Sequence, residues 1–367
     1  MGKKRINIIL LNLISIFSIA VMSGCNKIIN FDNDDVVVPI EDSKQALQIH
    51  TDRQNAYLKD KVKKINEYAV GEKEYSRPLQ HKYTWAGGKS PYTVYLSEKR
   101  NFANALILES SEREILLTNL KIKTTYYLKV TSSNEIIKED SFATEDTIIR
   151  NLYVSGVTNV RDLGGYKIGN VNTKQGLIFR TGRLNEDGTN VITNKITDKG
   201  KLTMLNELKV KSEIDLRLVD NNEVGMLTEG TGVLGNTVAY YQCPMNFNDP
   251  LDTDNNIAAL RKVFEILGNS TNYPTFFHCS LGTDRTGYIA WLINGCLGLD
   301  EENLYRDYLF SNFGNIGSKR TMDDIKDKYV KAIKNTNGGT LKEKTVNYLL
   351  NKGVKQSQID TLYSMML

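Results

Sequence analysis

Hydrophobic and polar residues alternate with two different periods along this chain. Between residues 75 and 147, short alternating or β-branched runs are separated by polar and glycine-rich clusters, which is the pattern of strands joined by turns. The runs cover residues 82–85, 93–96, 105–108, 114–117, 125–130 and 136–142. Six or seven strands in about 70 residues predict a small antiparallel β-sandwich.

Apolar runs alternate with helical stretches after residue 151. Short apolar runs end near residues 180, 218, 243 and 279, and helical spacing is found over residues 197–208, 257–267 and 288–293. Strands that alternate with helices predict an α/β domain, with a central, mostly parallel sheet flanked by helices. We assign residues 151–367 to this domain.

The first 24 residues have the pattern of an export signal. A basic start is followed by an apolar stretch over residues 6–22 and by small residues before Cys25, which is typical of a signal peptide. The run M-S-G-C that ends at Cys25 resembles a bacterial lipobox. This resemblance implies lipidation of Cys25 and export to a bacterial membrane, in the cell envelope or at the surface. A single spanning helix is the alternative, because the apolar stretch is near the short limit for crossing a bilayer.

Two further segments precede the strands. Residues 25–40 are polar and acidic, which predicts a tether, and residues 41–74 mix charged and apolar positions in a way that permits one or two helices or a linker. The run L-T-N-L at residues 117–120, the strand at residues 125–130 and the early Trp85 resemble fibronectin type III modules. A spacer is the favoured role for this β unit, and a carbohydrate-binding or partner-binding module is the alternative.

Charge gives no sign of a nucleic-acid partner. The chain has 47 Lys and Arg against 43 Asp and Glu, but Lys3, Lys4 and Arg5 lie in the segment expected to be removed. The mature chain is then almost neutral, whereas nucleic-acid-binding domains carry a strong basic patch. Beyond Cys25 the sequence has only Cys243, Cys279 and Cys296, an odd number that predicts a free thiol rather than a disulfide framework.

One stretch, residues 274–287, carries the candidate chemistry. An apolar strand leads to His278 and Cys279, a short loop with a glycine follows, and Arg285 opens an apolar helix. A loop of this length can turn several backbone N–H groups inward beside the positive end of the helix dipole, which suits a phosphate. Arg285 can hold two phosphate oxygens, and the same positive field favours the thiolate of Cys279, which is the nucleophilic form.

The motif H-C-x5-R-T-G at residues 278–287 resembles the signature loop of cysteine-dependent phosphatases. Its G-x-D-R-T-G form resembles a bacterial tyrosine phosphatase family whose loop reads HCxxGKDRTG and whose members act on phosphotyrosine and on phosphoinositides. Further resemblances are the N-x-R-D-x-G-G segment at residues 159–165, an R-T-G-R-L segment at residues 180–184, D-L-R at residues 215–217 and D-Y-L-x-S-N at residues 307–312.

The resemblance implies a role for each motif residue. Cys279 attacks phosphorus, Arg285 and the loop bind the phosphate, and Thr286 eases departure of the sulfur. His278 is expected to orient the loop or to stabilise the thiolate rather than to act as a base. Asp162 is expected to accept hydrogen bonds from the loop or from its arginine. The other residues expected to bind substrate or phosphate are Ser280, Leu281, Gly282, Thr283, Arg180 and Arg217. For Arg180 two possibilities stay open, a place on the pocket rim and an internal ion pair. No cofactor or metal is expected.

The general acid is open at this point. The resemblance assigns it to Asp284, where the helix N-terminus favours the ionised carboxylate and a bound phosphate favours the protonated one. The rival is a carboxylate of the loop that is expected to cover the site, Asp249, Asp252 or Asp254.

Thr283 stands where the family usually has a lysine, so one cation is missing from the pocket. This favours a phosphotyrosine protein as substrate over a multiply phosphorylated lipid or inositol. A non-catalytic surface protein that binds phosphate or phosphopeptides is the alternative from another functional class.

Overall fold

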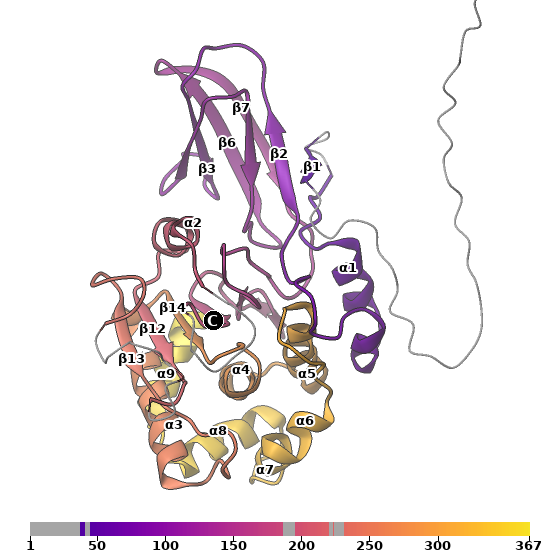
Figure 1. Ribbon diagram of the computed structural model, residues 1–367, viewed down its shortest axis with the longest axis vertical. Coiled ribbons are helices and arrows are strands. Elements are labelled where there is room, and N and C mark those ends of the chain that lie inside the picture. Colours follow the sequence, from indigo (N-terminus) through magenta and orange to yellow (C-terminus); the bar gives the residue numbers. More distant parts are fainter. Residues whose placement is uncertain (1–36, 41–44, 186–194, 220–222, 224–230) are drawn as a thin grey trace, which may run out of the picture.

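A computed structural model describes residues 37–40, 45–185, 195–219, 223 and 231–367. Cys25 and the predicted export signal lie outside the described residues. A β unit forms one end of the molecule and a larger α/β unit forms the other (Figure 1). Within the described part of the chain, no helix combines the length and the apolar character needed to cross a membrane.

The β unit consists of two sheets that share one apolar cluster, which contains Trp85, Val94, Leu117, Leu128 and Val130. Every predicted strand run is present. One sheet has the order β1-β2-β5 and the other β4-β3-β6-β7. Their bounds are β1 Val37–Pro39, β2 Gln80–Thr84, β3 Tyr92–Ser97, β4 Leu106–Ser110, β5 Glu114–Leu117, β6 Thr125–Ser132 and β7 Glu135–Ala143.

One pairing differs from the antiparallel prediction. Strand β1, from the segment predicted as a tether, pairs parallel with β2, whereas the other pairings within these two sheets are antiparallel. The run of valines before Pro39 explains the strand, because β-branched residues favour extended backbone. No comparison bears on the likeness to fibronectin type III modules, which stays a prediction.

The α/β unit is built on a five-stranded sheet with the order β13-β12-β14-β11-β8. All neighbours are parallel except β8, which pairs antiparallel with β11. The strands are β8 Arg161–Asp162, β11 Ile178–Thr181, β12 Ser212–Asp215, β13 Ala239–Gln242 and β14 Thr275–His278. Because the four parallel strands point the same way, the residues that follow them meet at one edge of the sheet.

Helices cover both faces of this sheet. Successive strand residues point to opposite faces, so Phe276 joins the cluster with Met204 and Leu208 while Phe277 joins the larger core around Trp291. A hairpin of β9 (Lys167–Ile168) and β10 (Val171–Asn172) stands beside the sheet. The helices are α2 Asp198–Leu202, its π-helical continuation Thr203–Glu207, α3 Asp254–Leu267, α4 Asp284–Leu297, α5 Glu301–Phe310, α6 Asp323–Ile325, α7 Lys331–Lys334, α8 Leu341–Asn351 and α9 Gln356–Met366.

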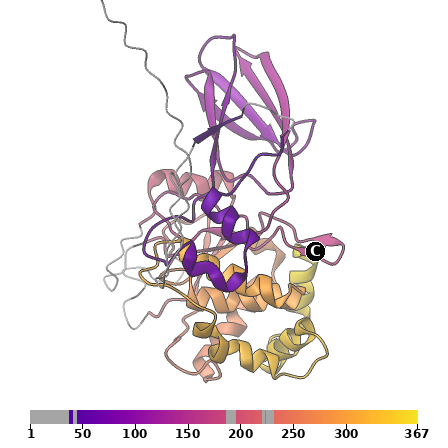
Figure 2. The ribbon, with the colours of Figure 1, turned by 90° about the vertical axis from the view of Figure 1, so that its right-hand side faces the viewer.

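The segment between β1 and β2 packs on the α/β unit. We call residues 51–77 the strap; it contains α1 (Asp52–Lys59) and the 3₁₀ helix Val62–Glu67 and crosses the α/β unit beside α5 (Figures 1 and 2). Tyr57 and Ile65 are buried in the larger core, and Arg306 of α5 donates to the carbonyls of Tyr57 and Asp60. The strap is therefore part of the α/β unit although the β unit separates the two in sequence.

Candidate active site

The stretch with the candidate chemistry forms the turn between β14 and α4, at the carboxyl edge of the sheet. Cys279 follows the last residue of β14, and α4 begins at Asp284 without a side chain to cap its N-terminus. Gly282 has a φ of +69°, and a Cβ at this position would stand 2.3 Å from the carbonyl oxygen of Thr181. Only glycine permits this tight turn against β11.

A cavity of about 250 Å³ opens in front of this turn. Of the residues predicted to bind phosphate, Ser280 and Leu281 line it, whereas Gly282 and Thr283 do not. The loop predicted to cover the site does form part of the wall, through residues 246–248. The described lining residues are Leu218, Glu223, Asn246, Phe247, Asn248, Cys279, Ser280, Leu281, Asp284 and Arg285.

Cys279 lies at the bottom of the cavity with only 4% of its surface exposed. Burial alone raises the pKa of its thiol, but the positive charge of Arg285 and hydrogen bonding from Thr286 outweigh burial, so the net pKa lies below the ordinary value. A lowered thiol pKa enlarges the thiolate fraction near neutrality. This is the property that the sequence motif predicts for a nucleophile.

Arg285 is bound by a carboxylate that sequence reasoning missed. Its Nη1 donates to Oε2 of Glu223 at 2.6 Å, and its Nη2 donates to Oε1 at 3.1 Å. Two parallel charge-assisted bonds are the geometry in which a guanidinium also binds phosphate. Glu223 therefore holds the arginine extended into the cavity, in the place where a phosphate would compete for the same donors.

Asp284 lies on the cavity wall, and three donors converge on its carboxylate. Nε and Nη2 of Arg320 each donate at 3.0 Å, and the hydroxyl of Tyr308 donates at 3.0 Å. The rival acids Asp249, Asp252 and Asp254 are not among the described lining residues. Of the candidate acids, the described geometry thus brings only Asp284 to the thiol.

The back of the loop is held by side chains from distant segments. Asn159 donates through Nδ2 to the carbonyls of Leu281 (3.2 Å) and Gly282 (2.9 Å). Arg180, predicted to line the rim or pair internally, is fully buried and donates to the carbonyl of Gly282 at 2.8 Å. Arg180 does not line the cavity and pairs with Asp307, so of the two possibilities left open for it the internal pairing is the one found, and Arg180 holds the loop backbone in place.

One buried aspartate joins these supports. Asp307 of α5 accepts from Arg161 at 2.8 Å and also pairs with Arg180. Arg161 in turn donates to the side chain of Asn159 and to Ser311. Burial lowers the pKa of Arg161 to about 10, with Arg180 adding to the effect and Asp307 opposing it. Two cations can share this interior only because the carboxylate of Asp307 lies between them.

The prediction for Asp162 is wrong. Its carboxylate accepts from Arg150 at 2.9 Å and from the backbone N–H groups of Gly164 (2.8 Å) and Gly176 (2.6 Å). Arg150 further donates to the carbonyls of Asn119 and Leu120 in the β unit. Asp162 therefore fixes a turn and the junction of the two units, because its strand β8 places alternate side chains on opposite faces and Arg161 takes the face toward the loop.

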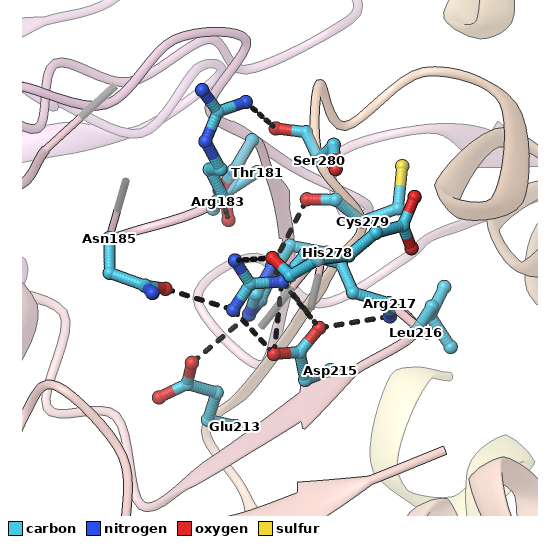
Figure 3. Close-up of polar contacts among 12 residues, drawn as sticks. Thr181, Arg183, Asn185, Glu213, Asp215, Leu216, Arg217, His278, Cys279 and Ser280 are labelled. Atoms are coloured by element: carbon cyan, nitrogen blue, oxygen red, sulfur yellow. Dashed lines mark hydrogen bonds and ion pairs between the residues drawn. The ribbon is translucent and has the colours of Figure 1, made fainter. Parts of the chain in front are cut away.

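Arg217 follows β12 as expected but does not line the cavity. Its guanidinium donates to both carboxylate oxygens of Asp215 and to Asn185 (Figure 3). It also donates to the carbonyl of Glu223. The predicted contact of Arg217 with substrate is also wrong, because its guanidinium forms an ion pair with Asp215, two residues earlier in the chain. Through the carbonyl of Glu223, Arg217 instead helps to place the partner of Arg285.

His278 lies behind Cys279 in a buried polar cluster (Figure 3). Its Nε2 lies 3.0 Å from Glu213, and its Nδ1 lies 3.2 Å from the carbonyl oxygen of Cys279. Burial lowers the pKa of His278, but Asp215 and Glu213 raise it more, so the net pKa is above the ordinary value. A protonated ring can donate at both nitrogens and so ties the Cys279 backbone to β12.

Glu213, Asp215 and His278 offer oxygen and nitrogen atoms within 4.8 Å of one another. Such a trio could hold a metal ion, yet Arg217 already binds both oxygens of Asp215 and Tyr240 donates to one of them at 2.8 Å. The charges of His278 and Arg217 overcome the effect of burial and lower the pKa of Asp215 to about 2. This cluster is an ion-pair support of the loop.

Several residues of the site were not assigned from sequence. Four of them lie inside recognised motifs, which marked these positions as important without revealing their roles. They are Asn159, Arg161, Asp307 and Ser311. Glu223 follows D-L-R by six residues and carries no pattern of its own. Arg320 likewise belongs to no recognised motif.

Comparisons with known proteins find similarity in the part of the chain that forms the α/β unit. Residues 152–367 match a family described as "Tyrosine phosphatase family". None of the curated proteins matches the chain. The catalytic core of the PP-IP phosphatase Siw14 from S. cerevisiae, solved with citrate, is similar at 20% identity and a TM-score of 0.29, over 46% of this chain and 93% of that one.

A second solved structure is P. aeruginosa TpbA, both alone and as a variant in complex with phosphotyrosine. The complex has 15% identity and a TM-score of 0.28, and the uncomplexed protein 16% and 0.27. Each comparison covers 55% of this chain, with 94% of the complexed TpbA chain and 95% of the uncomplexed one.

Proposed function

The chain belongs to the tyrosine phosphatase family, and from this premise we propose that it hydrolyses phosphate monoesters through a phosphocysteine intermediate on Cys279. The observation that carries the proposal is the pairing of a buried thiol of lowered pKa with Arg285 in one cavity. A nucleophile and a two-pronged cation so placed suit attack on a phosphate and stabilisation of its oxygens.

In the first step the thiolate of Cys279 attacks phosphorus, the sulfur–phosphorus bond forms and the bond to the leaving oxygen breaks. Arg285 exchanges Glu223 for the phosphate oxygens. Asp284 donates a proton to the leaving oxygen, since it is the only described aspartate in the cavity wall. Charge stabilisation and positioning supply most of the catalysis in such transfers.

In the second step a water molecule attacks the phosphocysteine. Asp284, now ionised, takes a proton from the water, the phosphorus–sulfur bond breaks, and inorganic phosphate leaves. Thr286 and Arg285 stabilise the returning thiolate by the same effects that lower its pKa in the resting site. His278 acts at a distance, by fixing the backbone of Cys279.

We propose a phosphotyrosine protein as the substrate. Arg285 is the only cation among the described residues that line the cavity, and the walls include the apolar side chains of Leu218, Phe247 and Leu281. One cation with apolar walls suits a single phosphate on an aromatic body. A multiply phosphorylated lipid or inositol would leave charges without partners.

The test is release of phosphate by the full-length protein, compared with Cys279→Ser. The full chain is needed because the strap is packed into the α/β unit. We expect p-nitrophenyl phosphate turnover in the parent and a loss of at least about 10⁴-fold in the variant, since other nucleophiles lose a similar amount on removal. If the parent and Cys279→Ser release phosphate at equal rates, the proposal fails and a protein that binds phosphate without catalysis is the remaining candidate. Phosphotyrosyl and phosphoseryl peptides, phosphoinositides and inositol phosphates, assayed in parallel, decide the substrate.

We also propose that the protein is exported and anchored to a bacterial membrane through lipid on Cys25. The support is the signal-like start of the chain and the M-S-G-C run. The β unit is then a fibronectin type III-like spacer between the anchor and the site. Metabolic labelling with a fatty acid should mark the parent and not Cys25→Ser.

A further inference from the structure

We propose that Ser76 and Glu74 of the strap are positioning residues for the signature loop, residues 279–285, and that they set its affinity for phosphate. The inference rests on the proposed function and deepens it. The active site then depends on a segment that lies between β1 and β2 and outside residues 152–367, the part of the chain that matches the family.

The first support is the place of Asn159 behind the loop. Its Nδ2 donates to the carbonyl oxygens of Leu281 and Gly282, at 3.2 and 2.9 Å, and the residue is fully buried. The backbone of Asn159 has a φ of +60°, a left-handed conformation that few residues other than glycine adopt. A backbone in such a conformation persists when surrounding contacts hold it.

The strap supplies one of these contacts. The backbone N–H of Asn159 donates to Oγ of Ser76 at 3.3 Å, although Ser76 precedes it by 83 residues. Ser76 is only 4% exposed. A hydroxyl has one proton and two positions at which it can accept. Because the proton of Ser76 is donated to Glu74, the hydroxyl oxygen is left to accept from Asn159.

Glu74 orients Ser76 and also holds Thr158. Its Oε1 accepts from the backbone N–H of Ser76 at 3.0 Å and from the Ser76 hydroxyl. Its Oε2 accepts from the hydroxyl of Thr158 and from the backbone N–H of Asn315 at 3.4 Å. The carbonyl of Thr158 in turn accepts from the backbone N–H of Gly182, at 3.0 Å. One carboxylate of the strap thus joins the segments that lie before β8, after β11 and after α5.

This end of the strap is itself fixed by backbone hydrogen bonds. The N–H of Gly71 donates to the carbonyl of Asn312 at 2.8 Å, and the N–H of Tyr75 donates to the carbonyl of Phe313 at 2.5 Å. The carbonyl of Gly71 accepts from the N–H of Ile316 at 2.8 Å. Ser76 and Glu74 are therefore presented from a preorganised backbone, as a residue that positions another must be.

The consequence concerns the curvature of the signature loop. In a trans peptide the carbonyl and the N–H that follows it point in opposite directions. Because Asn159 holds the carbonyls of Leu281 and Gly282, the next N–H groups point away from Asn159, and the loop keeps its curve in front of Cys279. Backbone N–H groups bind an anion only when the loop is curved in this way. Loss of the strap contacts should therefore weaken phosphate binding.

The experiment measures the competitive inhibition constant of inorganic phosphate against p-nitrophenyl phosphate, in the full-length parent, Ser76→Ala and Glu74→Gln. This constant does not depend on the fraction of folded enzyme, so a lower yield of folded protein does not change it. We expect it to rise about three- to tenfold in Ser76→Ala, where a buried N–H loses its acceptor. In Glu74→Gln it should rise at least as much, because an amide NH₂ then faces donors that an oxygen accepts from.

Tyr68→Phe is the matched control, because it also removes one hydroxyl from the strap. That hydroxyl donates to Asp60 at 2.8 Å and not to the segments behind the loop. Its inhibition constant should stay near that of the parent. Constants equal to the parent in both Ser76→Ala and Glu74→Gln, or an equal rise in Tyr68→Phe, overturn the role of Ser76 and Glu74 alone. Equal turnover by the parent and Cys279→Ser overturns the proposed function, and calorimetric titration with inorganic phosphate then decides the role of the strap by itself.

Discussion

The front and the back of the signature loop are built in different ways. In front, Cys279, Asp284 and Arg285 come from adjacent positions and face a cavity. Behind, Asn159, Arg161, Arg180, Asp307 and the cluster of His278 come from five separate segments and are buried. Chemistry is thus concentrated in one short stretch, whereas its rigidity is supplied by the whole α/β unit.

This difference teaches why a motif alone does not make an enzyme. The front residues must exchange their present partners for a ligand, so their contacts are selected for function rather than for stability. The back residues satisfy one another and the loop carbonyls, which holds the front side chains in place. Variants on the two sides should therefore separate activity from stability.

The largest expected effect is at the back, in Asp307→Asn. The substitution keeps the shape but leaves Arg161 and Arg180 as buried cations without a counter-ion, which costs about 3–5 kcal/mol of unfolding free energy. Denaturant unfolding measures the loss, and activity should fall with it. A stability within about 1 kcal/mol of the parent would contradict the buried ion-pair account.

A smaller effect is expected in front, in Asp284→Asn. Loss of the general acid should reduce kcat/KM for phenyl phosphate by about 10²-fold, and less for p-nitrophenyl phosphate, whose leaving group needs less protonation. The melting temperature should change little. Asp249→Asn is the control from the covering loop and should leave both substrates near parent values; a larger effect there than in Asp284→Asn would move the acid to that loop.

The smallest effect is the pH dependence of the cluster behind Cys279. Because the folded-state pKa of His278 is raised above its ordinary value of 6.5, its contribution to stability is complete below about pH 6.5 and is lost as the pH rises through the raised pKa. The slope is at most about 1.4 kcal/mol per pH unit. Unfolding of the parent and of His278→Gln across pH 5 to 9 should show a stability difference that shrinks with rising pH; a constant difference would mean that His278 is neutral throughout.

Sequence predicts the front of the loop much better than the back. Cys279 and Arg285 belong to one motif, and the five residues between them predict that both face the same loop. The strand and helix periods of the hydrophobic pattern predict the α/β unit and the strands of the β unit. The contacts of Asp162 and Arg217 were predicted wrongly and those of Arg180 were left open, because an arginine or aspartate at a strand end can turn toward the ligand or toward an internal partner. Only tertiary packing decides between these alternatives.

Glu223 and Arg320 mark a second limit. Each acts on a catalytic candidate from a long distance in sequence: 62 residues separate Glu223 from Arg285, and 36 residues separate Arg320 from Asp284. Neither lies at a spacing that a helix or strand would make meaningful. Their roles follow from how loops meet at the sheet edge, which local patterns do not encode.

The strap has a consequence for how the chain acquires its fold during synthesis. The strap is synthesised long before α5, because Arg306 of α5 follows its hydrogen-bond partner Tyr57 by 249 residues. The apolar side chains of the strap therefore lack this packing partner until α5 has been synthesised. The β unit can fold in that interval, and it joins its two ends, since Leu47 bridges Thr144 and the backbone of Ile49 donates to Glu145. Its folding therefore shortens the effective loop that the strap must close.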